Sequence, residues 1–169
     1  MGDILNLLSL FILMKPPKIL VGCPVSDYHA YCTDEYLARA QALSYPQYDL
    51  FLVDNSATPR FSEYLRSKHV SFAHDFATLT DVKEKIALSR DMLRKKALEE
   101  GYDYFFSLEQ DVIPPADVLE QLLHHNKPII SGVYYSYFPV QGKQMLFPVL
   151  YRALTTEEQT TMRQQLPLL

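Results

Sequence analysis

Residues 48–56 read YDLFLVDNS, a short apolar run that stops at three turn-forming side chains. Two other segments repeat this pattern, KILVGCPVSD at residues 18–27 and DYFFSLEQD at residues 103–111. The three apolar runs do not alternate strictly between apolar and polar positions, which is typical of parallel strands buried on both faces. The pattern therefore predicts a parallel sheet with polar residues at the carboxyl ends of its strands.

Helix-forming segments separate these runs. Thr33 and Asp34 are good capping residues, and Asp81 with Glu84 forms an Asp-x-x-Glu analogue of the capping box, with Gly101 as the stop. Helices are expected at residues 35–43, 82–100 and 115–124, and further strands at 70–73, 127–134 and 145–151. An apolar stripe of Val82, Ile86, Leu93 and Ala97 is expected inside the longest helix. This alternation predicts an α/β fold, with a mostly parallel sheet and helices on both faces.

The 169 residues predict one domain with appendages: an apolar extension at 1–17, the domain at 18–151 and a polar, helical tail at 152–169. Residues 4–14 are too few to span a membrane, and no basic residue precedes them as in a signal peptide. Three interpretations stay open: an interfacial anchor giving weak peripheral membrane contact, a helix packed on the domain, or a segment upstream of a natural start at Met14.

Composition excludes several classes of protein. Hydrophobic residues make up 48% and charged residues 21%, which argues against disordered and collagen-like chains. The net charge of −4, without a long basic run, argues against nucleic acid as a partner. Cys23 and Cys32 lack the spacing of a zinc site or a disulfide framework, so a reducing, cytoplasmic setting is expected.

Ligands of open α/β sheets bind beyond the carboxyl ends of the strands, and three such ends are polar here: residues 24–27, 54–56 and 109–111. Neither a Gly-x-Gly-x-x-Gly fingerprint nor a P-loop is present. In an extended segment, Glu109 and Asp111 would point to the same side. Such a pair could share Mg²⁺ or Mn²⁺, which would neutralise a diphosphate, whereas a solvated turn is the simpler alternative.

Four segments follow one another along the chain: KILVGCPV, YPQYDLFLVDNS, ALEEGYDYFFSLEQDVIPP and IISGVYY. In their order the chain resembles nucleotide-sugar glycosyltransferases of the GT-A fold, and looks closest to the broad family 2 group. The resemblance spans about residues 18–135, and Glu109 and Asp111 stand where that family has Asp-x-Asp. It implies a GT-A sheet, a nucleotide-sugar donor, a Mn²⁺ or Mg²⁺ cofactor, and a glycan, lipid or protein acceptor. The implied reaction is sugar transfer to an acceptor hydroxyl.

Residue roles follow from the same resemblance. It implies that Pro24 and Val25 line the nucleotide pocket, and that Asp54 contacts the base or ribose with Asn55 and Ser56 nearby. It also implies that Arg90 faces the donor. Asp111 would coordinate the cation, and Glu109 would contact the sugar, the ribose or the cation. Simpler alternatives are that Asp54 caps its turn and that Arg90 forms a structural salt bridge. Arg94 and the His124–His125 pair are expected at the surface, whereas the tyrosines of SGVYYSYF could line an acceptor groove or pack at a sheet edge.

A catalytic base is missing from this pattern. In inverting members of the group a carboxylate in the acceptor half activates the hydroxyl, but the acids after Tyr135 are Glu157 and Glu158, in the polar tail. The alternative functions are therefore a non-catalytic nucleotide-sugar-binding module or a truncated remnant of a longer enzyme. A receiver-type regulatory domain is weaker, since it would need an acidic cluster where Cys23, Pro24 and Val25 stand.

Overall fold

The computed structural model describes residues 15–74 and 81–148. They fall into two units that divide between His124 and His125. The expectations for residues 4–14, for the tail from residue 152 and for residues 149–151 lie outside the described part of the chain. Within the described part, each helix is too short or too polar to cross a membrane.

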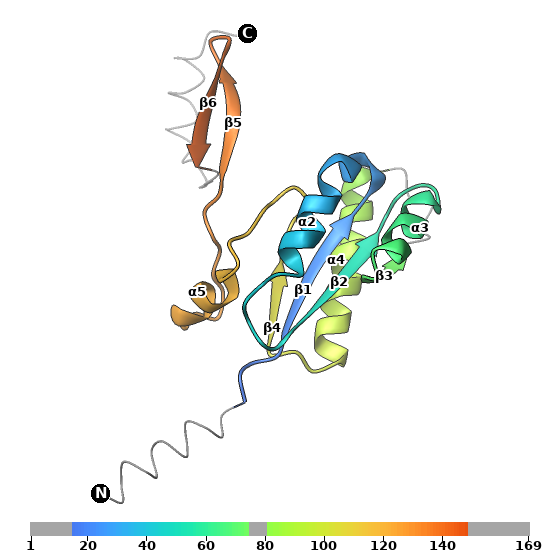
Figure 1. The fold of residues 1–169 in the computed structure, drawn as a ribbon, viewed down its shortest axis with the longest axis vertical. Helices are drawn as coiled ribbons and strands as arrows, with labels where there is room; N and C mark the ends of the chain where they lie inside the picture. Colours follow the sequence, from blue (N-terminus) through green and yellow to red (C-terminus); the bar gives the residue numbers. More distant parts are fainter. Residues whose placement is uncertain (1–14, 75–80, 149–169) are drawn as a thin grey trace, which may run out of the picture. The chain divides into compact units, whose positions relative to one another are not determined.

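The first unit contains a four-stranded parallel sheet (Figure 1), which confirms the predicted parallel pairing. Its strands are β1 (Ile19–Val25), β2 (Tyr48–Asp54), β3 (Ser71–His74) and β4 (Tyr104–Ser107), in the order β3-β2-β1-β4. The register pairs Val25 with Asp54, so the ends of β1 and β2 are level. This order matches the first four strands of dinucleotide-binding sheets and differs from receiver domains, where β3 lies beside β1. The order therefore argues against the receiver-type alternative.

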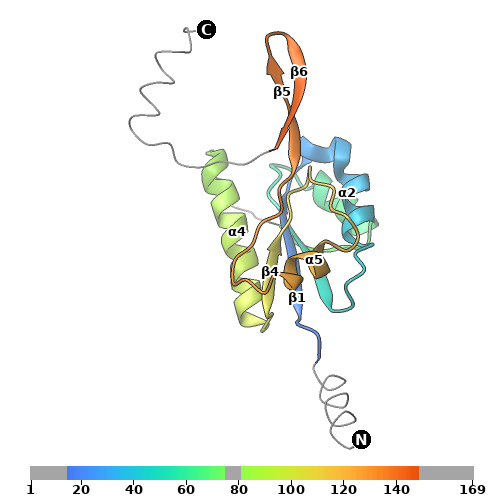
Figure 2. The ribbon, with the colours of Figure 1, turned by 90° about the vertical axis from the view of Figure 1, so that its left-hand side faces the viewer.

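Helices cover both faces of the sheet, as predicted. The helical segments of this unit are η1 (Asp27–Cys32), α2 (Thr33–Ala40), α3 (Arg60–Ser67), α4 (Val82–Glu99) and α5 (Val118–His124). Figure 2 shows α4 and α2 on opposite sides of the sheet. The reason lies in the strand order: from β1 to β3 each new strand is added on the same side of the preceding one, whereas β4 is added on the other side of β1. A right-handed crossover in the reverse direction lies on the opposite face.

Two apolar layers hold the sheet between these helices. On the α2 and α3 face, Val21 and Cys23 of β1 join a core with Tyr36, Leu52 and Leu65. Because successive strand residues point to opposite faces, Gly22 faces α4 instead. A Cβ at Gly22 would lie 2.6 Å from Phe105 Cε2 and 2.9 Å from Leu93 Cδ2. A larger residue at position 22 would therefore displace the Phe105 ring and the end of the Leu93 side chain.

The apolar stripe predicted for α4 is only half buried. Leu93 is fully buried and Ala97 is 8% exposed, but Val82 is 68% and Ile86 is 37% exposed. The prediction is wrong for these two because they line a pocket at the carboxyl ends of the strands instead of the core. Helix α3 was absent from the prediction, since a helix of eight residues gives little periodicity.

The second unit, in its described part, contains a β-hairpin of β5 (Tyr135–Val140) and β6 (Lys143–Pro148). Gln141 and Gly142 have φ values of 49° and 74°, as in the two-residue turns that suit a twisted hairpin. The strand predicted at residues 127–134 is wrong, because this segment has no strand partner among the described residues. The prediction at 145–151 holds for residues 145–148, but that strand pairs antiparallel, apart from the main sheet.

Candidate functional site

A pocket of about 470 Å³ lies at the carboxyl ends of the parallel strands. Its walls come from the loop after β1, the turn after β2, the first turns of α4 and the turn after β4. These segments meet where the chain order of the sheet reverses, between β1 and β4. Such switch points are the usual ligand sites of open α/β sheets, and the volume is in the range of small-molecule sites.

Most of the residues singled out in the sequence line this pocket, namely Pro24, Val25, Asn55, Ser56, Glu109 and Asp111. Asp54 and Arg90 do not line it. The pocket also contains Tyr28 and Lys85, which the sequence did not single out, and Asp27 and Gln110, which belong to the polar strand ends but were given no role of their own.

Glu109 and Asp111 reach the same pocket, but by a different geometry from the expected one. They belong to a turn, not an extended segment, because the Val112 N–H donates to the Glu109 carbonyl at 3.1 Å. The residue between them, Gln110, is 3% exposed and points into the protein. The buried Gln110 side chain thus fixes the turn from which both carboxylates reach the pocket.

Gln110 holds the turn by hydrogen bonds to the loop after β1. Its Oε1 accepts from the Ser26 N–H at 3.0 Å. Its Nε2 donates to Thr33 Oγ1 at 2.7 Å, and lies 3.3 Å from the carbonyl oxygens of Ser26 and His29. A neutral amide fits this position because it both donates and accepts. No sequence pattern indicated this role, because the partners of Gln110 lie more than 75 positions away.

The two carboxylates differ in their partners. Glu109 Oε1 accepts from Arg90 Nη2 at 2.6 Å, and both side chains are about half exposed. Asp111 is exposed and has no hydrogen bond or ion pair with any described residue. The structure therefore favours the salt-bridge interpretation of Arg90 and leaves Asp111 as the carboxylate available to a cation. Arg94 is at the surface, as expected, and pairs with Asp91 at 2.6 Å.

Asp54 is fully buried, and both of its oxygens are engaged within the protein. Oδ1 accepts from the Ser56 N–H at 2.9 Å, which forms an Asx-type turn. Oδ2 accepts from the Ser62 hydroxyl and lies 3.2 Å from His74 Nδ1. This arrangement favours the capping interpretation over a contact with base or ribose.

Asn55 and Ser56 extend the strand end and brace the pocket wall. The Asn55 N–H donates to the Val25 carbonyl at 3.0 Å, and Asn55 Nδ2 lies 3.3 Å from Ser89 Oγ on α4. Ser56 Oγ accepts from the Asp27 N–H at 2.9 Å. Both side chains thus link the end of β2 to a neighbouring wall of the pocket.

Lys85 is the one Lys or Arg among the described residues that line the pocket. It is half-buried in the first turns of α4 and forms no ion pair with a described residue. Lys85 lies three positions after Val82 of the predicted stripe, which places the two on the same side of the helix. The described lining of the pocket therefore combines one Lys with the three acids Asp27, Glu109 and Asp111.

The cysteine thiols offer no nucleophile. Burial raises the pKa of Cys23 far above its ordinary value, and burial followed by the charge of Asp111 raises the pKa of Cys32. Both thiols are therefore protonated at neutral pH. Among the described residues no cluster of three or more His, Cys, Asp or Glu side chains could hold a metal on its own.

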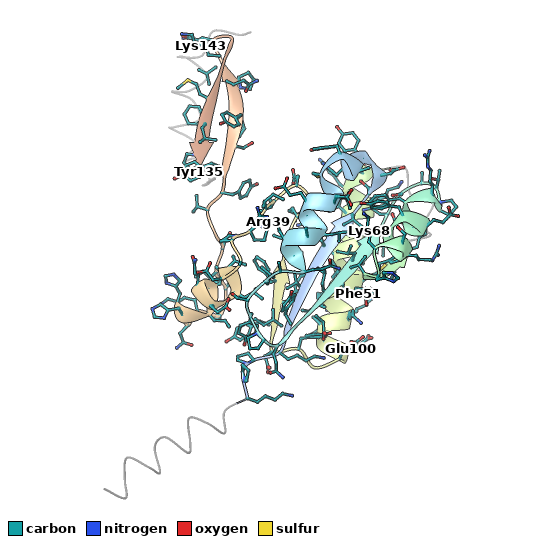
Figure 3. The ribbon with its side chains drawn as sticks, viewed as in Figure 1. Arg39, Phe51, Lys68, Glu100, Tyr135 and Lys143 are labelled. Atoms are coloured by element: carbon teal, nitrogen blue, oxygen red, sulfur yellow. The ribbon has the colours of Figure 1, made fainter. Side chains whose placement is uncertain are left out.

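A larger pocket of about 620 Å³ lies at the opposite end of the strands, and Figure 3 labels two of its residues, Phe51 and Glu100. Its charged groups are already engaged. Lys96 Nζ donates to Glu100 Oε1 at 2.5 Å, and the Tyr102 hydroxyl donates to Asp49 Oδ2 at 2.7 Å. The smaller pocket is the better candidate, because Asp111 and Lys85 there have no partner among the described residues.

Comparison with known proteins adds no relative to this description: no protein-family model matches the chain, and no curated protein matches it significantly.

Proposed function

We propose that this chain binds a nucleotide-sugar in the pocket at the strand ends and transfers the sugar to an acceptor hydroxyl, assisted by a divalent cation. The observation that carries the proposal is the convergence of Glu109 and Asp111 on one pocket at the switch point of a parallel sheet. The order of sequence motifs supports it, since it resembles GT-A glycosyltransferases of family 2. A sheet of GT-A type is part of the proposal.

The acids of the pocket suit Mg²⁺ or Mn²⁺. Carboxylate oxygens are the ligands these ions prefer, and Mg²⁺ commonly takes one or two carboxylates together with substrate phosphates. Asp111 would be the main ligand and Glu109 the second, in exchange for part of its contact with Arg90. When bound, the cation supplies charge that stabilises a departing diphosphate.

The chain's own residues would do the rest of the binding. The Lys85 ammonium lines the pocket and can donate to a phosphate oxygen. Val82 and Ile86 give the same wall an apolar surface. Ser56 and Asn55 brace the end of β2, so the wall is held before the ligand arrives. These groups bind and orient a donor; they do not activate an acceptor.

Binding without transfer is the second candidate, and one observation favours it. No Asp or Glu occurs in the sequence between Glu120 and Glu157, so the segment that follows α5 offers no carboxylate to deprotonate an acceptor. General-base catalysis contributes about 10²–10⁴-fold to a rate. A chain without that base would hold a donor but turn it over slowly.

Thermal melts test the donor site. The wild type, Asp111→Asn and a control, Glu99→Gln on the exposed face of α4, would be melted with UDP, GDP and dTDP, each with and without Mn²⁺. A ligand at 100 times its dissociation constant stabilises by about 2.7 kcal/mol, which corresponds to a rise of roughly 5–10 °C here. A Mn²⁺-dependent rise that Asp111→Asn loses and Glu99→Gln keeps is expected. If none of the three nucleotides raises the melting temperature, the proposal is refuted.

Release of the nucleoside diphosphate then separates the two candidates. The nucleotide that raises the melting temperature names the base, and nucleotide-sugars with that base are incubated with the protein and Mn²⁺. Metal-dependent release that Asp111→Asn abolishes supports an enzyme. Stabilisation by the donor without release supports the binding module.

A further inference from the structure

The hairpin of β5 and β6 is apolar on both of its faces. Strand pairing places Tyr137 opposite Leu146 on one face and Phe138 opposite Met145 on the other. All four side chains are substantially exposed, at 67%, 53%, 38% and 45% respectively. Figure 3 shows side chains leaving the ribbon on both sides, with Tyr135 and Lys143 at its two ends.

Such a hairpin needs a surface that covers it. A two-stranded ribbon alone is marginally stable in water, and contiguous exposed apolar surface marks an interaction site. The two faces together expose Tyr135, Tyr137, Phe138, Val140, Met145, Leu146 and Phe147. No described strand pairs with either outer edge of the ribbon.

The charge of this segment indicates what the surface is. The 36 residues between Glu120 and Glu157 contain no acid but do contain Lys127, Lys143 and Arg152, although the whole chain has a net charge of −4. Lys143 directly follows the hairpin turn. The hairpin itself carries Lys143 as its one charged residue and no acid, so this aromatic ribbon is complementary to an apolar surface with negative charge.

We propose that the β5–β6 hairpin docks this protein on an anionic lipid surface. A folded protein partner would cover one face of the ribbon, whereas lipid can surround both, and both are apolar here. Tyrosine rings suit the boundary between lipid and water, and Lys143 can extend its ammonium to the headgroups. This inference does not depend on the proposed function.

The outer edges of the hairpin limit its depth. Unpaired backbone N–H and C=O groups do not enter the hydrocarbon core of a bilayer, because nothing there satisfies them. The hairpin therefore lies among the headgroups, where water reaches its edges. Amphipathic segments bind at that depth through apolar contact combined with attraction to anionic lipids.

Single-tryptophan reporters test the proposal directly, because the chain has no tryptophan of its own. Tyr137→Trp and Phe138→Trp each place one reporter on a different face of the hairpin in the full chain. Vesicles of phosphatidylcholine with phosphatidylserine should shift the emission of both reporters to the blue, and brominated acyl chains should quench both. Vesicles of phosphatidylcholine alone should give a much smaller change. A shift of one reporter only, or of neither, would overturn the proposal.

Variants in a vesicle sedimentation assay separate apolar contact from charge. Lys143→Glu should weaken binding about fivefold or more, since each cation near an anionic surface contributes about that factor. The double variant Met145→Gln, Leu146→Gln, which alters both faces, should weaken it at least tenfold. Leu98→Gln and Lys83→Glu, at exposed positions of α4, are matched controls and should bind as the wild type does. Binding that survives every hairpin variant would mean that another segment contacts the lipid, and would refute the proposal.

Self-association is the competing result. If the hairpin served as a contact between copies of this chain, the wild type would be a dimer in sedimentation velocity without lipid. The Met145→Gln, Leu146→Gln variant would then be a monomer. A monomeric wild type that binds anionic vesicles is the result that supports lipid docking.

Discussion

Gln110 shows how one buried side chain can position a site that it does not itself serve chemically. Its amide accepts from the Ser26 N–H and donates to Thr33, and both of its neighbours present carboxylates to the pocket. The residue types at 109 and 111 therefore set the chemistry of the turn, and the residue at 110 sets where that chemistry takes place.

Replacing Gln110 with Leu should destabilise the protein by about 1–3 kcal/mol, because the half-buried Ser26 N–H loses its acceptor and the buried Thr33 hydroxyl keeps only the His29 carbonyl as a partner. Urea unfolding, followed by circular dichroism, measures the loss. The control is Gln121→Leu, at an exposed position of α5. A loss below about 0.5 kcal/mol would mean that water replaces the amide and that the turn does not depend on it.

Lys85→Gln should weaken the binding of a nucleoside diphosphate by about 10- to 100-fold, the effect of removing one charge-assisted hydrogen bond. The corresponding nucleoside, which has no phosphate, should bind both proteins equally. Lys83→Gln is the matched control, since Lys83 belongs to the same turns of α4 but is exposed and outside the pocket. Calorimetric titration separates the cases. An equal loss for nucleoside and diphosphate would show that Lys85 shapes the pocket without contacting phosphate.

The sequence predicted the place of the pocket but not the partners of each residue. Polar residues at the ends of three apolar runs predicted the place, because parallel strands end at the same edge of a sheet. The pairing of Arg90 with Glu109 joins residues 19 positions apart, and that of Asp54 with His74 joins residues 20 apart. Such pairs depend on the register of elements and on side-chain rotamers, which periodicity does not contain.

At the scale of elements, an ion pair links two helices that cover the same face of the sheet. Lys68 follows α3, and its Nζ lies 2.6 Å from Oδ1 of Asp34 in α2. The Tyr64 hydroxyl donates to the same oxygen at 2.7 Å. Hydrogen bonds from Lys68 and then Tyr64 lower the pKa of Asp34. The folded state therefore favours the ionised carboxyl.

The lowered pKa of Asp34 predicts a pH-dependent contribution to stability. Since the pKa is lower in the folded state, the contribution is complete above the unfolded-state value of about 4 and is lost as the pH falls through the folded-state value. Asp34→Asn should therefore unfold at lower urea than the wild type at pH 7, and the difference should shrink under acid. Glu35→Gln, at the next position, is the control. A difference that stays constant with pH would show that the carboxyl charge is not the cause.

Prediction of the elements succeeded where local chemistry decides and failed where distant partners do. Helix α4 starts at Val82 as predicted, because Asp81 accepts from the Lys83 N–H at 2.7 Å and the Glu84 N–H at 3.2 Å. Strands β1 and β2 follow from long apolar runs. Residues 127–134 have a similar composition but form no strand, since a strand also needs a neighbour to satisfy its backbone.

On the scale of the whole molecule, apolar surface is distributed unequally between the two units. In the first unit β1 lies between β2 and β4, with buried side chains on both faces. In the second unit the described strands have one partner each and remain exposed. Local opening of a structure costs less free energy where fewer apolar contacts are lost. The two units should therefore differ in stability within one chain.

Hydrogen–deuterium exchange, followed by mass spectrometry, measures this difference. Without lipid, peptides from β5 and β6 should exchange roughly 100-fold or more faster than peptides from β1, because the hairpin amides can open locally while those of β1 need the sheet to unfold. Peptides from β3, an edge strand of four residues, should lie between them. With anionic vesicles present, exchange of the hairpin should slow while that of β1 is unchanged. Equal protection of β1 and the hairpin in lipid-free protein would show that the hairpin is already covered in solution. That result would contradict docking of its apolar faces on lipid.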